Sequence, residues 1–163
     1  MITGLKPRGF TWIISDRLAV SERIGGNGFQ HRRVRREEEI NWLVSEGRIT
    51  CVVNLLPGNQ NVGAYAAAGL STISVPMGLD WDRGTYPKKL YEALYRALED
   101  PAARVLVHRD VIDDTLAGLL GGYLIESGLL DDRILAAAVI QEILGRALGP
   151  EGRALIPDPS AGA

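Results

Sequence analysis

Cysteine is nearly absent from this chain, which carries only Cys51 among its 163 residues. One cysteine excludes an intrachain disulfide and any zinc site built on a cysteine pair, and it favours a reducing, cytoplasmic compartment. Long apolar runs are also missing, since no stretch approaches the roughly 20 apolar residues that cross a bilayer. The first residues, MITGLKPRGF, lack the apolar core of a secretory signal. We therefore expect neither membrane insertion nor secretion.

Strong charge of either sign is missing as well. The formal net charge of −2 gives no general attraction to nucleic acid or to an anionic membrane. The length and the 46% content of hydrophobic residues suit one soluble domain, which we place at residues 1–148. The remainder, GPEGRALIPDPSAGA (149–163), is rich in Pro, Gly and Ala, and is expected to be a flexible, poorly ordered tail.

Short apolar segments alternate with helical patterns along the chain. A hairpin is predicted at its start, from Thr11–Ile14 and residues 18–20 around Ser15-Asp16. Further strands are predicted at 50–55, 71–75 and 105–107, and helices at 37–45, 64–68, 87–99, 116–125 and 131–148. This alternation predicts an α/β fold of three layers, with a mostly parallel central sheet flanked by helices. Loops at the carboxyl ends of the strands would then form the site.

The segment VLVHRDVIDDTLAGLLGGYLIESG has the layout of a phosphate-binding loop, because an apolar strand runs through a polar loop into a helix. Backbone amides at such a helix start stabilise an anion. The candidate loop consists of His108, Arg109, Asp110, Val111, Ile112, Asp113, Asp114 and Thr115.

The order of motifs resembles the atypical dual-specificity branch of the protein tyrosine phosphatase superfamily. The resemblance covers roughly residues 9 to 145 and is carried by GFTWIISDRLAVSER, NWLVSEGRITCVVNL, STISVPMGLDWDRGTYP and the segment around His108. It implies the dual-specificity phosphatase fold and a loop of pattern HCxxGxxR, usually followed by Ser or Thr. In that family the Cys thiolate attacks phosphorus, the Arg and the loop amides hold the phosphate oxygens, and an Asp on another loop protonates the leaving oxygen.

The family's reactive residues are replaced in this chain. Aligned on His108 without gaps, Arg109 stands at the nucleophile, Ile112 at the Gly, Thr115 at the Arg and Leu116 at the Ser/Thr. A gap of one or two residues would place Asp114-Thr115 on the Arg-Ser/Thr pair, yet it restores neither Cys nor Arg. Guanidinium stays protonated and cannot attack, and a β-branched residue resists conformations that Gly permits. The thiolate mechanism is therefore excluded at this position.

The loop carries three carboxylates in place of the family's reactive residues. Asp110, Asp113 and Asp114 would repel a phosphate dianion, and Asp113, Asp114 or Thr115 would cap the following helix. Our hypothesis is that one side-chain carboxylate occupies the place of the substrate phosphate, while Arg109 pairs with a neighbouring Asp. The alternative is that these acids only cap the helix and face solvent.

The segment MGLDWDRGTYP resembles the family's general-acid loop and carries Asp80 and Asp82. The resemblance implies that either Asp80 or Asp82 stands at the position of the family's general acid. Without a nucleophile, we expect them to be solvated loop residues or partners of Arg83. Trp81 on this loop is a candidate for recognition of a partner.

Two other functions stay open. Carboxylates suit hard cations, so the Asp cluster could serve a metal-assisted hydrolase, although its spacing matches no calcium-loop motif. The run HRRVRREEE could bind an anionic ligand or a phosphorylated partner through Arg32, Arg33, Arg35 and Arg36. Against this, Arg and Glu at helical spacing neutralise one another, and no aromatic stacking platform supports nucleic-acid binding. Cys51 is expected to be a buried core thiol, and His31 an exposed loop residue.

The sequence thus predicts a cytoplasmic pseudophosphatase with no cofactor and no metal. Its expected partners are proteins, or further copies of itself.

Overall fold

A computed structural model describes residues 4–59 and 61–159 of the chain. Within this part the strands are β1 (Thr11–Ile14), β2 (Leu18–Ser21), β3 (Cys51–Asn54), β4 (Ser71–Ser74) and β5 (Val105–His108). The helices are α1 (Arg33–Ser45), α2 (Val62–Ala67), α3 (Tyr86–Ala97), α4 (Asp114–Glu126), α5 (Arg133–Leu144) and α6 (Pro150–Leu155), with a 3₁₀ turn, η1 (Gly28–Gln30). These described residues include no helix that is both long and apolar enough to span a membrane.

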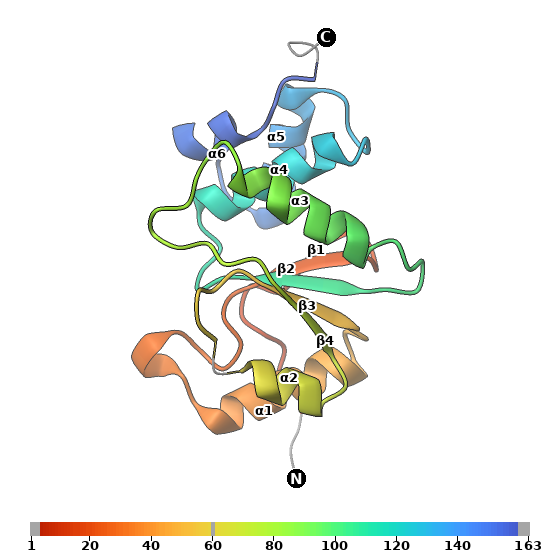
Figure 1. Ribbon diagram of the computed structural model, residues 1–163, viewed down its shortest axis with the longest axis vertical. Coiled ribbons are helices and arrows are strands. Elements are labelled where there is room, and N and C mark those ends of the chain that lie inside the picture. The colour runs from red at the N-terminus through yellow and green to blue at the C-terminus, as the bar shows by residue number, and fades with distance from the viewer. Residues whose placement is uncertain (1–3, 60, 160–163) are drawn as a thin grey trace.

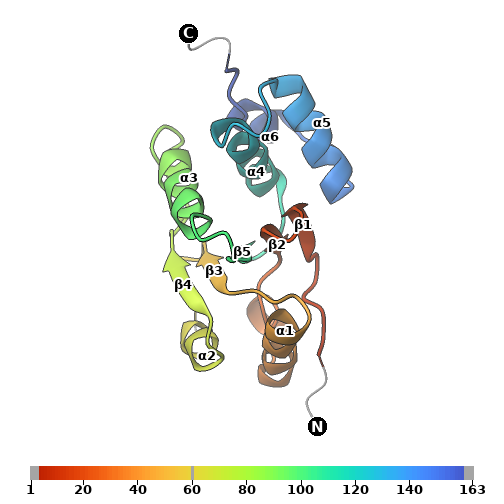
Figure 2. The same cartoon turned by 90° about the vertical axis from the view of Figure 1, so that its right-hand side faces the viewer.

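The five strands form one sheet in the order β1-β2-β5-β3-β4. β1 and β2 are the predicted hairpin and pair antiparallel, and β2, β5, β3 and β4 run parallel to one another. Figures 1 and 2 show α1 and α2 on one face of the sheet and α3, α4, α5 and α6 on the other. The predicted three-layer α/β fold with a mostly parallel sheet is confirmed.

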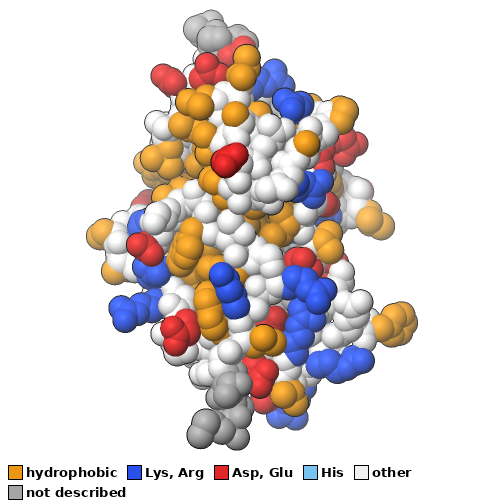
Figure 3. Space-filling model, turned by 180° about the vertical axis from the view of Figure 1, so that it is seen from behind, with side chains coloured by type: hydrophobic (Ala, Val, Ile, Leu, Met, Phe, Trp, Pro, Cys, Tyr) orange, Lys and Arg blue, Asp and Glu red, His pale blue; other side chains and the backbone are white. Residues whose placement is uncertain are grey.

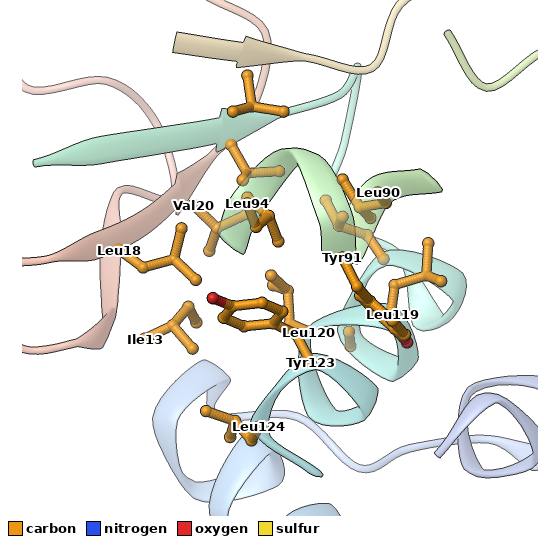
Figure 4. Packing of buried hydrophobic residues seen from close by; sticks show 14 of the residues in the cluster. Ile13, Leu18, Val20, Leu90, Tyr91, Leu94, Leu119, Leu120, Tyr123 and Leu124 are labelled. Atoms are coloured by element: carbon orange, nitrogen blue, oxygen red, sulfur yellow. The ribbon is translucent and has the colours of Figure 1, made fainter. Parts of the chain in front are cut away.

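The central strands are buried on both faces of the sheet. Successive side chains along each strand point to opposite faces and contribute to two separate hydrophobic cores. In β5, Val105 and Val107 join the core under α3, α4 and α5, while Leu106 points to the core under α1 and α2. Figure 4 shows the first core, where Tyr123 and Leu120 of α4 lie close to Leu94 of α3 and to Ile13 and Leu18 of the hairpin. This double burial explains why these strands are continuous apolar runs in the sequence.

Helix α1 begins at Arg33, four residues before the predicted start at Glu37. The arginines that looked like a separate basic run form its first turns, since Arg33 pairs with Glu37 (Nε–Oε1 3.1 Å) and Arg35 with Glu39 (Nε–Oε2 3.4 Å). Such pairs four residues apart stabilise a helix that apolar periodicity does not reveal.

The prediction of a flexible tail at residues 149–163 is wrong for much of that segment. Residues Pro150–Leu155 form α6, which packs on α4, and Ile156 is buried in the core. Pro150 at the helix start has the backbone angle that a helix needs, and Gly152 lets two backbones meet, because a Cβ on Gly118 of α4 would overlap the Gly152 carbonyl. The domain therefore extends beyond residue 148, while residues 160–163 of the predicted tail lie outside the described part.

Candidate functional site

The candidate loop connects the carboxyl end of β5 to the start of α4, as predicted. His108 is the last residue of β5, and Asp113 is the N-cap of α4 with extended backbone. Oδ1 of Asp113 accepts a hydrogen bond from the Leu116 amide at 2.9 Å. The prediction that one of these acids caps the helix is confirmed.

Arg109 turns back onto this cap. Its Nη1 lies 3.3 Å from Oδ2 of Asp113, and the two side chains are 21% and 41% exposed. One carboxylate thus joins the helix start to the guanidinium that stands at the family's nucleophile position. The predicted pairing of Arg109 with a neighbouring Asp is confirmed, whereas the idea that this carboxylate takes the place of a phosphate stays a prediction.

Further arginines fix the rest of the loop. The Arg23 guanidinium lies 3.3 Å from Oδ1 of Asp110, and the Arg23 amide donates to the Asp110 carbonyl. Arg146, after α5, donates from Nη1 to the Ile112 carbonyl at 2.8 Å. Among the described residues, none from 109 to 115 has a positive φ, so Ile112 sits in backbone that a β-branched residue accepts.

Asp114 serves a different helix from Asp113. Its two carboxylate oxygens accept hydrogen bonds from the amides of Gly149 (2.7 Å) and Gly152 (2.8 Å), at the start of α6. A carboxylate there satisfies amides that a helix leaves unpaired and complements the positive end of the helix dipole. Asp114 therefore anchors the C-terminal helix to the candidate loop.

The three loop carboxylates thus have three separate partners: Arg23, the start of α4 and the start of α6. Within residues 4–59 and 61–159, no three His, Cys, Asp or Glu side chains gather as metal ligands would. The metal-assisted alternative consequently has no ligand set in this part of the chain.

A buried polar network lies beneath the loop. His108 is fully buried, and its Nε2 lies 3.1 Å from the Tyr65 hydroxyl and 3.5 Å from Nδ2 of Asn59. Burial lowers the pKa of His108 from its ordinary 6.5 to about 4, with a contribution from the positive charge of Arg23. Burial also raises the pKa of Tyr65 to about 12. At neutral pH both groups are therefore uncharged, and they hold the strand ends together rather than carrying charge to a substrate.

The loop that resembles a general-acid loop is used for structure. Oδ1 of Asp82 accepts hydrogen bonds from the amides of Gly84 (2.7 Å) and Thr85 (3.1 Å), just before α3. Asp80 is exposed. The alternative prediction that these acids pair with Arg83 is wrong, because Nη2 of Arg83 lies 3.3 Å from Oε2 of Glu151 in α6. The Arg83 guanidinium also stacks on the Trp81 ring at 4.9 Å.

Two of the four arginines in the run, Arg33 and Arg35, are neutralised by glutamates. Besides the pairs of Arg33 and Arg35 with glutamates, Arg32 donates to the carbonyls of Phe29 and His31. Arg36 is half-buried. Figure 3 shows acidic side chains among the basic ones on the face that carries α1. These contacts favour the structural interpretation of this run over anion binding.

Some residues that hold the site together were missed by the sequence analysis. His31, predicted to be an exposed loop residue, is half-buried, and its Nε2 lies 3.2 Å from Oδ1 of Asn61. Glu39 is buried and accepts a hydrogen bond from the Gly25 amide at 2.7 Å, and its pKa is raised by burial. Arg23 and Arg146 gave no signal, because their partners lie far away in the sequence.

Cys51 is buried, as predicted, and its position is informative. It is the first residue of β3 and pairs in register with Val105, the first residue of β5, whereas His108 is the last residue of β5. The single thiol of the chain therefore lies at the opposite end of the strands from the candidate loop. It cannot replace a nucleophile at Arg109.

Comparison with solved structures identifies the fold. The core catalytic domain of the PP-IP phosphatase SIW14 from S. cerevisiae superposes with a TM-score of 0.68 at 13% identity, over 94% of this chain and 86% of that one. Kinase associated phosphatase gives a TM-score of 0.67 at 14% identity, over 93% of each chain. Human DUSP28 gives 0.62 at 18% identity, over 93% of this chain and 92% of that one.

The chain has the tyrosine and dual-specificity phosphatase fold. No family model matches the sequence, and no curated protein matches it either. The structures are similar along nearly their whole length despite low identity. This places the loop after β5 in the context of a phosphatase fold.

Proposed function

We propose that this chain is a catalytically inactive protein of the phosphatase fold, a pseudophosphatase that acts by binding other proteins. One observation carries the proposal: the residue after His108 is Arg109, and its guanidinium is ion-paired with the carboxylate that caps α4. The solved kinase associated phosphatase carries a substitution of its catalytic-site cysteine to serine, so the catalytic site of that protein naturally contains a cysteine. This chain offers no thiol at its loop.

The electrostatics of the loop support the same proposal. An active loop needs free amides and a free cation for the oxygens of a phosphate. Here the Leu116 amide is hydrogen-bonded to Asp113, and the guanidinium of Arg109 is paired with the same carboxylate. A dianionic substrate would have to displace this carboxylate from both the Leu116 amide and the Arg109 guanidinium.

We therefore expect the purified protein to show no turnover of a generic aryl phosphate, with or without magnesium or manganese. The physical reason is the absence of a nucleophile and of a free anion site at the loop. A continuous absorbance assay checks this prediction, with an active dual-specificity phosphatase as positive control. A metal-dependent rate that is lost in Asp110→Ala or Asp113→Ala would contradict it and would favour the hydrolase alternative.

For the biological setting, we propose a cytoplasmic protein whose partners are proteins, since a chain with one cysteine cannot form an intrachain disulfide. Binding through the arginine run is less favoured, because Arg33 and Arg35 already pair with glutamates.

A further inference from the structure

The β4 edge of the sheet is open to a further strand. β4 ends the strand order and pairs with β3 in unbroken register from Ser71 to Ser74. The opposite edge is protected, because β1 has an irregularity between Trp12 and Ile14 and α5 packs against it. Figure 2 shows β4 at the outer edge, between α2 and α3. A regular edge strand presents backbone N–H and C=O groups that an extended chain can pair with.

The groups that face outward can be assigned. The amides of Ser71 and Val75 donate to the carbonyls of Thr50 (3.0 Å) and Asn54 (2.9 Å), beside β3. Because backbone groups alternate in direction along a strand, those of Ile73 also point to β3. The N–H and C=O groups of Thr72 and Ser74 therefore point away from the sheet.

A groove runs beside these groups, between β4 and α3, with a volume of about 530 Å³. The apolar residues that line it include Ile73 of β4, Val75 directly after β4, and Ala93 of α3. The Tyr86 hydroxyl donates to the Val75 carbonyl at 2.6 Å and holds the helix at this distance from the strand. When an extended peptide adds to a sheet edge beside a groove, its backbone hydrogen bonds to the edge strand supply affinity. Every second side chain of the peptide then lies in the groove.

The charged side chains of α3 that line the groove indicate which charge a bound segment would carry. Glu92 and Arg96 pair with each other, with Oε1 and Nη2 2.6 Å apart. Lys89 is exposed and has no ion-pair partner in the described part of the chain, so the groove is left with one uncompensated positive charge. The chain as a whole has a net charge of −2.

We propose that the β4–α3 groove binds an extended, acidic segment of a partner protein, which adds a strand to β4 and places a carboxylate beside Lys89. This inference builds on the proposed binding function and names the surface that performs it. The bound segment would hydrogen-bond to Thr72 and Ser74, and apolar side chains at alternate positions would cover Ile73 and Val75.

A labelled ten-residue peptide that alternates Val with Glu tests the proposal, with a Val/Lys peptide as its matched control. By fluorescence anisotropy we expect the acidic peptide to bind at least tenfold more tightly than the basic one. Lys89→Glu should reverse this preference. In hydrogen exchange, the amides of Thr72 and Ser74 should become protected when the acidic peptide is added.

A backbone variant separates strand addition from charge attraction. Thr72→Pro removes an outward N–H without removing a bond to β3, and proline is tolerated on such an edge, so binding should fall at least tenfold while the melting temperature changes little. Thr72→Val keeps the N–H and should bind normally. If Thr72→Pro unfolds the protein, the hydrogen-exchange measurement and the Lys89→Glu variant still test whether the acidic peptide binds at β4.

Equal binding of the two peptides, or no exchange protection in β4, would overturn the proposal. Concentration-dependent dimerisation that is lost in Thr72→Pro, without peptide binding, would assign the edge to a second copy of this chain instead. None of these outcomes changes the expected inactivity toward aryl phosphates, so the two proposals fail separately.

Discussion

Asp114→Ala is expected to lower the free energy of unfolding by about 3 kcal/mol. The substitution removes both acceptors of the Gly149 and Gly152 amides and leaves the start of α6 without a cap. A hydrogen bond to a charged group contributes about 1.5–3 kcal/mol, so two such bonds give about 3–6 kcal/mol. Since the Asp114 side chain is partly exposed, we place the loss at the lower end of this range.

Urea denaturation followed by far-ultraviolet circular dichroism measures this loss, with an unchanged slope showing that the unfolded state is the same. Asp114→Asn keeps one carbonyl oxygen and should lose less than Asp114→Ala. Asp131→Ala, at an exposed carboxylate before α5, is the matched control and should stay within about 0.5 kcal/mol of the parent protein. A loss below about 0.5 kcal/mol for Asp114→Ala would show that α6 is held by its apolar contacts alone.

Mild acid should destabilise the protein through His108. The unfolded chain takes up a proton on this ring near the ordinary pKa of 6.5, whereas the folded protein does so only at about 4. The unfolded state therefore binds more protons between these values, so the contribution to stability is complete above pH 6.5 and is lost as the pH falls toward 4. A difference of this size in pKa corresponds to about 3 kcal/mol.

A series of denaturant titrations from pH 7.5 to pH 4 measures this effect. Glu39 acts in the opposite direction, because a raised carboxyl pKa gives stability that is gained as the pH falls. The histidine effect is therefore isolated by comparison with His108→Gln, in which the fall should be smaller by about 3 kcal/mol. His31→Gln removes the other histidine and should keep the full profile. An unchanged profile in His108→Gln would contradict the assignment.

The strands and the candidate loop could be predicted from the sequence, because their signals are local. Val105–Val107 is a continuous apolar run, and Asp113 stands three residues before Leu116, where the apolar helical pattern begins, so a buried strand and a helix cap follow from neighbouring residues. The confirmed pairing of Arg109 with an Asp also spans only four residues.

The contacts that anchor the loop could not be predicted, since they join residues far apart in the sequence. Asp114 meets Gly149 across 35 residues, and Arg23 meets Asp110 across 87. For the same reason the segment after residue 148 resembled a tail: its Pro and Gly content is typical of disorder, yet Gly152 is what lets α6 approach Gly118. The early start of α1 was missed because its first turns are charged and carry little apolar periodicity.

The central claim is that the loop as a whole, and not one substitution, has lost phosphatase chemistry. The most direct measurement is aryl phosphate hydrolysis by Arg109→Cys, which restores a thiol at the nucleophile position. The account predicts a rate equal to that of the parent protein, because the loop still lacks the family's Arg and Asp113 still engages the amide at the start of α4. Turnover by Arg109→Cys, with a burst of product equal to the enzyme concentration, would contradict the account.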